Sequence, residues 1–96
     1  MKDKKHLARV AKLPCCICRE WNETVVPHHR TGAGMGRKDC DYNTMPLCYI
    51  HHTAGGLGVA VHAGEETWEG IYGTQDSFIA ETQAILGIKE SEKCGV

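Results

Sequence analysis

The chain has 96 residues, of which 24% are charged, and its formal net charge is -1. This length suits one small domain with a modest buried surface. The near-zero charge provides no global basic field of the kind that attracts nucleic acid, and no apolar run is long enough to cross a membrane. The opening MKDKKHLARV lacks the apolar segment of a secretory signal, so we expect a cytoplasmic protein with no membrane partner.

Large apolar side chains are sparse in this chain, which has one Phe, two Trp and three Tyr beside eleven Gly. A core this thin usually needs a covalent or metal crosslink. Six cysteines can supply disulfides or metal thiolates. A reducing compartment favours thiolates, so we expect a structural metal rather than disulfides.

The first half of the chain predicts one helix and two strands. Residues 3–12 have helical apolar spacing, and the proline at 14 ends the pattern. Two β-branched valines in WNETVVP, residues 21–27, predict a short strand leading into the histidine pair HH. Glycines argue against regular structure over 31–41. Residues 43–47 can form the return strand, with its proline tolerated near an end or on an edge.

The second half is predicted to be helical. Residues 48–53 fit the first turn of a helix, which glycines at 55, 56 and 58 interrupt. Apolar residues at 68, 71 and 72 predict a short helix that a glycine ends. A last helix covers 74–86, with Thr74 or Asp76 as its cap. Its apolar stripe comprises Phe78, Ile79, Thr82, Ile85 and Leu86. These elements predict a small α+β domain.

Two cysteine and histidine pairs have the spacing of a structural zinc site. Zinc takes four soft or borderline ligands in a tetrahedron, often from two knuckles with two intervening residues. Cys15 and Cys18 form one such pair, and Cys48 and His51 form another. We therefore expect these four residues to bind a structural Zn²⁺.

The remaining cysteines leave alternatives open. Cys16 can replace its neighbour only with the poorer C-x-C spacing, and Cys40 and Cys94 receive no role. A redox dithiol or unligated thiols are the other interpretations of CCIC. A redox protein would need a βαβ context, which this sequence does not suggest.

Four further histidines, His28, His29, His52 and His62, converge on the central glycine-rich loop. Successive strand residues point to opposite faces, so the first two cannot easily bind one ion together. His52 follows a zinc ligand on a helix and is rotated roughly 100° from it, so it can face a second site. We interpret His6 as an ordinary core or surface residue.

The combination of CxxC, HH, GMGRKxxD and PLCxxHH resembles the HNH (ββα-metal) endonuclease superfamily, in particular the phage-type HNH nucleases related to the recombination-enhancing nuclease Ref. The resemblance covers about residues 14–73, with the helices at about 3–12 and 74–86 flanking it. It implies a single HNH nuclease domain over 1–96 with a treble-clef-like ββα-metal core, of phage or prophage origin.

The resemblance also implies roles for individual residues. His28 would be a ligand of a catalytic divalent ion, and His29 would be the general base. His52 would be the second metal ligand. Gly56 stands where the family has its third ligand, which leaves His62 as the candidate if the GGLG stretch loops out. By register, Asp41 takes the place of the central asparagine, with Asn43 as the alternative, and either can equally be a turn residue.

We therefore expect a metal-dependent endonuclease that hydrolyses DNA phosphodiester bonds with low sequence specificity. Arg30, Arg37 and Lys38 would contact backbone phosphates, which position nucleic acid without reading its sequence. The resemblance implies Mg²⁺ or Mn²⁺ as the catalytic ion, whereas an imidazole-rich site also suits Zn²⁺ or Ni²⁺. The chain would act as a monomer or homodimer. The alternative is a catalytically degenerate or non-enzymatic zinc-stabilised DNA-binding module.

Overall fold

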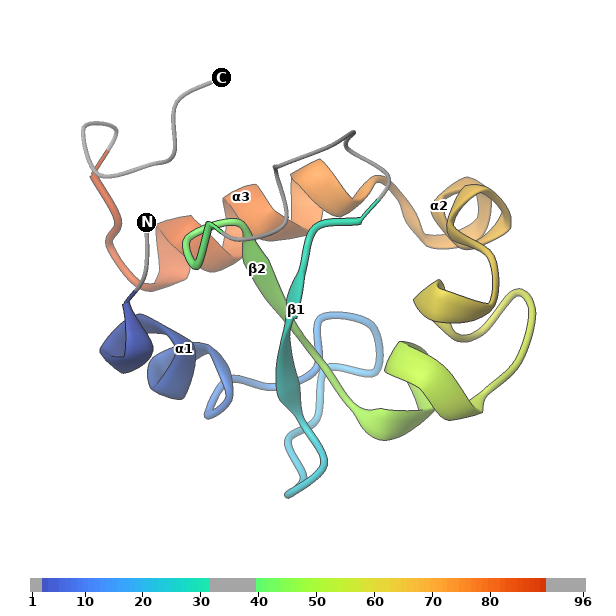
Figure 1. Ribbon diagram of the computed structural model, residues 1–96, viewed down its shortest axis with the longest axis horizontal. Helices are drawn as coiled ribbons and strands as arrows, with labels where there is room; N and C mark the ends of the chain where they lie inside the picture. The colour runs from blue at the N-terminus through green and yellow to red at the C-terminus, as the bar shows by residue number, and fades with distance from the viewer. Residues whose placement is uncertain (1–2, 32–39, 90–96) are drawn as a thin grey trace.

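A computed structural model describes residues 3–31 and 40–89 of the chain. Within these ranges it has a small mixed α+β fold with a two-stranded sheet, which confirms the predicted α+β class (Figure 1). None of the helices there is long and apolar enough to span a membrane. In chain order the elements are α1 (Lys4–Val10), β1 (Val26–His29), β2 (Thr44–Leu47), the π-helix η1 (Ile50–Ala54), the 3₁₀-helix η2 (Val61–Ala63), α2 (Glu65–Tyr72) and α3 (Gln75–Ile85).

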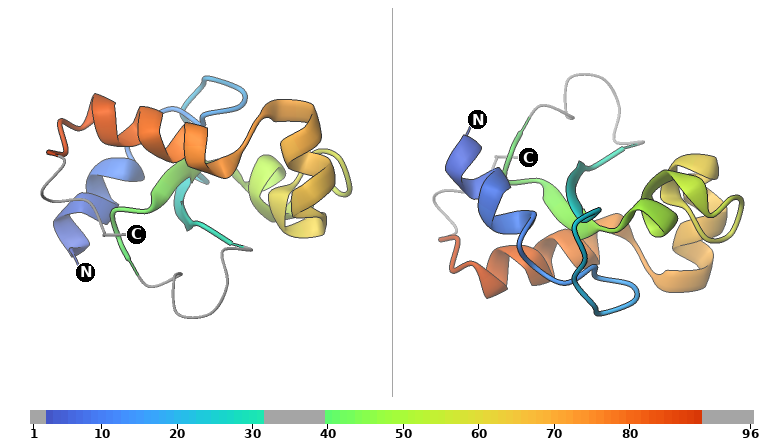
Figure 2. Two further views of the ribbon diagram at one scale, coloured as in Figure 1. Left: turned by 90° about the horizontal axis from the view of Figure 1, so that it is seen from above. Right: turned by 90° about the horizontal axis from the view of Figure 1, so that it is seen from below.

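The two strands pair antiparallel and cross the middle of the molecule. Helix α1 lies toward one end of this hairpin, and η1, η2 and α2 lie toward the other (Figure 1). Helix α3 runs along one face of the hairpin, as Figure 2 shows in two further views, and packs on β2. The sheet therefore connects a helical end near the N-terminus to the histidine-rich end.

The first strand begins later than the sequence pattern predicts. Residues 21–27 were expected to be strand, but Asn22 turns the chain: its side-chain oxygen accepts the N–H of Thr24 at 2.8 Å. Its carbonyl accepts the N–H of Val25 at 3.1 Å. Asparagine often stabilises such turns through its own side chain. The strand consequently starts at Val26 and includes both histidines of the HH pair, His28 and His29.

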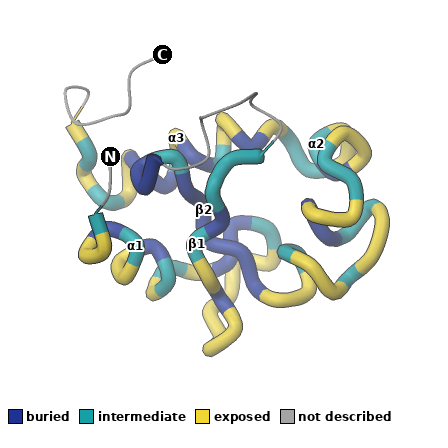
Figure 3. Tube along the Cα trace, in the orientation of Figure 1, coloured by how far each residue is buried: buried dark blue, intermediate teal, exposed yellow. Residues whose placement is uncertain are grey.

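The second strand is buried along its whole length, as the dark segment in Figure 3 shows. Pro46 lies opposite Pro27 in the register. Each strand of a two-stranded sheet has a free edge, so a proline is tolerated in either. The Pro46 carbonyl accepts the N–H of Cys16 at 3.0 Å, which ties the segment of the first cysteines to the sheet.

The core lies between the sheet, α2 and α3. Trp68 is fully buried, and its indole N–H donates to the carbonyl of Val59 at 3.1 Å. The buried core residues of this cluster are Cys15, Cys16, Val25, Met45, Leu47, Cys48, Val61, Trp68 and Ile79.

The apolar stripe predicted for the last helix is wrong at one position. Ile85 is 59% exposed, whereas Gln75, Ile79 and Thr82 are buried. At 100° per residue, Ile85 lies about 120° away from Ile79 around the helix. The face against the core therefore starts with a glutamine. Thr74 is the cap, since its hydroxyl oxygen accepts the N–H of Ser77 at 3.1 Å.

Candidate metal centres

The first candidate metal centre brings together Cys15, Cys18, Cys48 and His51. Their ligand atoms all lie within 4.8 Å of one another. The Nδ1 atom of His51 lies 3.2 Å from the Cys48 sulfur and 3.8 Å from the Cys15 sulfur. This is the Cys₃His set that the sequence predicts, and such a set suits a tetrahedral structural metal such as zinc.

The turn at CCIC is built by main-chain hydrogen bonds. The carbonyl of Cys15 accepts the N–H of Arg19 at 2.8 Å, and the Cys15 N–H donates to Glu20 at 3.0 Å. Arg19 has a positive φ of 62°, which is uncommon outside glycine and closes the turn. The N–H of Ile17 points at the Cys15 sulfur from 3.5 Å. The turn thus holds this sulfur beside the second knuckle.

The neighbouring cysteines differ in how readily they ionise. Burial opposes ionisation of Cys15, but main-chain N–H groups donating to its sulfur outweigh this and lower its pKa. Burial raises the pKa of Cys16 to about 12, and this thiol packs in the core. Burial also raises the pKa of Cys18 to about 11. Between the two candidates for the first ligand position, the geometry and the chemistry both favour Cys15.

The second candidate metal centre consists of His28, His52 and His62, whose ligand atoms also lie within 4.8 Å of one another. They come from three elements: β1, η1 and η2. The Nε2 atoms of His52 and His62 are 3.1 Å apart, and the His28 ring centroid lies 5.2 Å from that of His52 and 4.9 Å from that of His62. The structure therefore places together the three histidines that the HNH resemblance implied as ligands.

A tight turn carries His62 back to His52. Gly56 and Gly58 have φ values of +82° and +83°, which side chains rarely adopt. The Gly56 carbonyl accepts the N–H groups of Val59 and Ala60, at 3.0 and 2.8 Å. The GGLG stretch thus reverses the chain immediately after the π-helix. This reversal brings His62 beside His52, where it can serve as the third ligand that Gly56 cannot provide.

Two histidines of this centre have lowered pKa values, which favours their neutral form. Burial lowers the pKa of His28 to about 4. Burial, followed by the proximity of His62, lowers the pKa of His52. Neutral imidazoles carry the lone pair that a metal needs, and they do not repel one another as imidazolium ions would. The donor set therefore fits a divalent cation.

His29 lies on the opposite side of β1 from His28, as the strand periodicity predicts. Its Nε2 atom is 3.0 Å from an oxygen of Asp41, which is 4% exposed. The other Asp41 oxygen accepts the N–H of Asp3, at the start of α1, at 2.6 Å. An ionised carboxylate can only accept, so this contact orients the His29 ring with Nε2 toward Asp41.

Asn43, the alternative to Asp41, contributes through its backbone. Its carbonyl accepts the N–H of Arg30 at 3.0 Å and continues the hydrogen bonding of the two strands. Asp41 is therefore the better candidate for a side-chain role beside His29.

The residues predicted to contact DNA are only partly described. The Arg30 guanidinium is paired with the Asp76 carboxylate, with Nη2 3.1 Å from Oδ2. The hydrogen bond to this carboxylate raises the pKa of Arg30. Arg37 and Lys38 lie outside the described residues.

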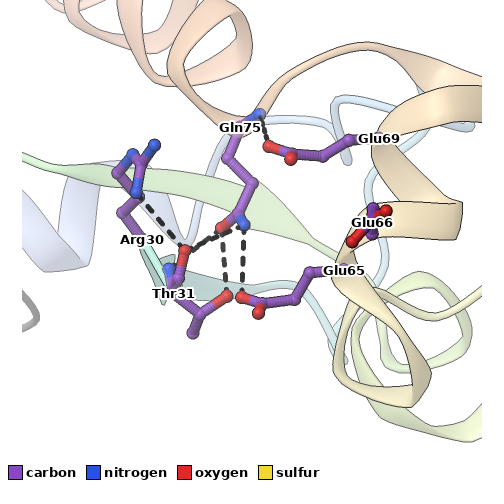
Figure 4. A pocket seen from close by; sticks show the side chains of 6 residues that line it. All are labelled: Arg30, Thr31, Glu65, Glu66, Glu69 and Gln75. Carbon is purple, nitrogen blue, oxygen red and sulfur yellow. Dashed lines mark hydrogen bonds between the residues drawn. The ribbon is translucent and has the colours of Figure 1, made fainter. Parts of the chain in front are cut away.

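Gln75 is a residue of this region that the sequence analysis missed. Its side-chain oxygen lies 3.0 Å from the Nε2 atom of His28. Figure 4 shows Gln75 extending from the start of α3 toward Thr31, with Glu65 and Glu69 of α2 on its other side. These residues line a hollow of about 200 Å³. The sequence contained one sign of this role: Gln75 is a polar residue on the same helix face as Ile79 and Thr82.

His6 is fully buried, and its ring meets that of Tyr42 edge to face at 4.6 Å. Neither ring nitrogen has a hydrogen-bond partner within the described residues. Burial lowers the pKa of His6, so a neutral ring at this position packs as a core residue. It lies apart from both clusters of candidate ligands.

Fold and side-chain clusters together define a small α+β protein that has, among residues 3–31 and 40–89, two groups of Cys and His residues at metal-binding distance. Residues 1–86 match the model of a family described as "Protein of unknown function (DUF968)", and the chain belongs to this family. No curated protein and no solved structure matches the chain.

Proposed function

We propose that the protein is a metal-dependent endonuclease of the HNH (ββα-metal) type that hydrolyses DNA phosphodiester bonds with low sequence specificity. The observation that carries this proposal is the arrangement around one strand. On one side of β1, His28 meets His52 and His62. On the other side, the adjacent His29 is held by Asp41. A set of metal ligands next to an oriented base is what metal-assisted hydrolysis requires.

In this proposal the Cys₃His cluster is structural. It joins the turn at Cys15 to the segment that begins η1, and these segments lie far apart in the sequence. Four protein ligands close a tetrahedral site and leave no position for substrate. The cluster therefore binds Zn²⁺ for folding, and the chemistry belongs to the histidine cluster.

The histidine cluster supplies three neutral ligands and leaves coordination positions for a phosphate oxygen. His28, His52 and His62 would hold a divalent cation, which would supply positive charge to the phosphate and to the leaving oxygen. The ligand type suits Zn²⁺ and Ni²⁺, and Mg²⁺ or Mn²⁺ is the expectation from the HNH resemblance. Because His28, His52 and His62 bring no charge of their own, the bound phosphate provides the counter-charge.

His29 is the proposed general base. Its Nε2–H donates to Asp41 at 3.0 Å, so Nδ1 is available to take a proton from an attacking water. Asp41 is in turn held by the N–H of Asp3. The carboxylate fixes the ring orientation and stabilises the imidazolium that forms, as an acid partner does in other hydrolases.

The test is cleavage of supercoiled plasmid by purified protein in EDTA, Mg²⁺, Mn²⁺, Ni²⁺ and Zn²⁺, with His29→Ala alongside. We expect metal-dependent nicking or linearisation, reduced by about 10²- to 10⁴-fold in the variant. Metal content and melting temperature of the two proteins should match. Equal turnover in His29→Ala would remove His29 as the base. Absence of cleavage with every metal, from a folded wild type holding zinc, would favour the degenerate or binding-only module.

A further inference from the structure

We propose that Gln75 is a positioning residue for the histidine cluster: it accepts the Nε2–H of His28 and so leaves the lone pair on Nδ1, the atom with which His28 would bind a metal shared with His52 and His62. This inference rests on the proposed metal site and extends it to helix α3, outside the segment of the HNH resemblance. The key question is which atom of the Gln75 amide faces His28.

The backbone of Thr31 answers that question. The Thr31 N–H donates to Oε1 of Gln75 at 3.1 Å, and the Thr31 carbonyl accepts from Nε2 of Gln75 at 3.2 Å (Figure 4). A reversed amide would set N–H against N–H and oxygen against oxygen. Backbone groups have fixed donor and acceptor roles, so these two bonds determine the orientation of the amide.

This orientation determines the tautomer of His28. The amide oxygen that faces His28 Nε2 from 3.0 Å can only accept a hydrogen bond. A neutral imidazole has one N–H and one lone pair, so the hydrogen is on Nε2 and the lone pair on Nδ1. The partner of one ring nitrogen commonly sets which nitrogen a metal binds.

Gln75 itself is firmly held. It is 1% exposed, and its main-chain N–H donates to Glu69 Oε2 at 2.8 Å. Its side-chain nitrogen also lies 3.5 Å from Glu65 Oε2. An amide suits this position better than a carboxylate, because it donates to the Thr31 carbonyl and adds no negative charge beside the two glutamates. The network thus connects α2, α3 and β1 through a side chain that lies 3.0 Å from His28 Nε2.

The first test is the tautomer of His28 in the wild-type protein, read from the ¹⁵N chemical shifts and ring couplings of its imidazole. We expect Nε2–H before the second metal is added, and metal at Nδ1 after Zn²⁺ is added. Nδ1–H in the zinc-folded protein, or metal at Nε2, would overturn the proposal. The first of these readings does not depend on whether the histidine cluster binds metal or whether the protein cleaves DNA.

The second test compares two glutamine-to-leucine changes on α3. Gln75→Leu removes the acceptor facing His28. Gln83→Leu is the matched control, because Gln83 is also buried but donates to the Tyr42 carbonyl, at 2.8 Å. Loss of a partner behind a metal ligand typically weakens metal binding about 10- to 100-fold. We expect that loss for the second metal equivalent in Gln75→Leu, and wild-type affinity in Gln83→Leu, by calorimetric titration with Zn²⁺.

The outcomes separate this inference from the proposed function. Equal affinity for the second equivalent in Gln75→Leu and wild type, with both folded, would overturn the role of Gln75. A wild type that takes up two metals, shows the expected tautomer and yet cleaves no DNA would refute the nuclease while supporting Gln75. If Gln75→Leu does not fold, the His28 tautomer measured in the wild-type protein still tests the role of Gln75.

Discussion

The two candidate metal centres share the π-helix η1 but are built in different ways. The Cys₃His cluster uses two pairs, each confined to four consecutive residues, 15–18 and 48–51. The histidine cluster uses one residue from each of three elements, and a residue of α3 lies behind it. His51 and His52, neighbours on η1, point to different clusters. π-helical turns are rare and often occur at functional sites.

The two clusters are related to the fold in different ways: the first would stabilise the fold, whereas the second is assembled by it. The first cluster joins segments that are distant in the sequence, so a metal bound there would hold the fold together. The second is assembled by segments that other contacts already hold, such as the turn at Gly56 and the network of Gln75. We expect changes in the first cluster to affect stability and changes in the second to affect metal content and chemistry.

The largest expected effect is that of Cys48→Ser. Structural zinc contributes on the order of 10 kcal/mol in small zinc domains, comparable to the whole stability of a small domain. We expect this variant to lose its zinc and unfold near room temperature, measured by circular dichroism and metal analysis. Cys16→Ala is the control, since Cys16 is buried beside the cluster but is not part of it. A Cys48→Ser protein that melts like the wild type would contradict the structural role.

The next largest effect is that of His52→Ala, which should remove one metal centre and leave the other intact. His52→Ala should keep one equivalent of zinc and the wild-type fold, lose the second metal equivalent, and lose cleavage. The reason is that His52 faces His28 and His62, whereas the adjacent His51 serves the cysteines. Metal analysis after dialysis against excess Zn²⁺ measures this. Loss of both equivalents together would show that the two centres are one cooperative unit.

A smaller effect is expected for Asp41→Asn, which touches neither cluster. The amide can still face His29 but has lost the charge that stabilises the imidazolium, so kcat should fall by about 10- to 100-fold with two metals retained. Plasmid cleavage under single-turnover conditions measures the change. An unchanged rate would confine Asp41 to holding the start of α1 through its bond to Asp3.

The smallest effect is on acid stability. The Tyr42 hydroxyl donates to Asp3 Oδ2 at 2.7 Å and lowers the pKa of Asp3 below its usual 3.8. A lowered carboxyl pKa means that this stabilisation is present above pH 3.8 and is lost as pH falls through the lower folded value. Tyr42→Phe should therefore reduce the melting temperature at pH 7 slightly and flatten its decline in acid. Tyr72→Phe, which leaves Asp3 untouched, is the control.

Much of the fold follows from local signals. The cap at Thr74 and the glycine at 73 mark the start of α3 and the end of α2, because caps and terminating glycines act within a turn of the chain. The strand boundary at Val26 was missed because the Asn22 side chain competes with the strand pattern of the valines. Ile85 was misplaced because its spacing from Phe78 and Thr82 is helical, but it is the last residue of α3 and lies exposed there.

The sequence by itself proposed the members of the first cluster, since a spacing of two residues brings both members of each pair to one turn. That the two pairs meet, with Cys15 rather than Cys16 beside His51, was decided by the tertiary structure. The sequence also supplied the candidates His28, His52 and His62. Only the tertiary structure decided that these three meet, because the meeting depends on the reversal at Gly56 and on the contacts of η1 with η2 and with β2. Gln75 is the plainest case: it lies 47 residues from His28 in the chain and 3.0 Å from it in space. No local pattern encodes that contact.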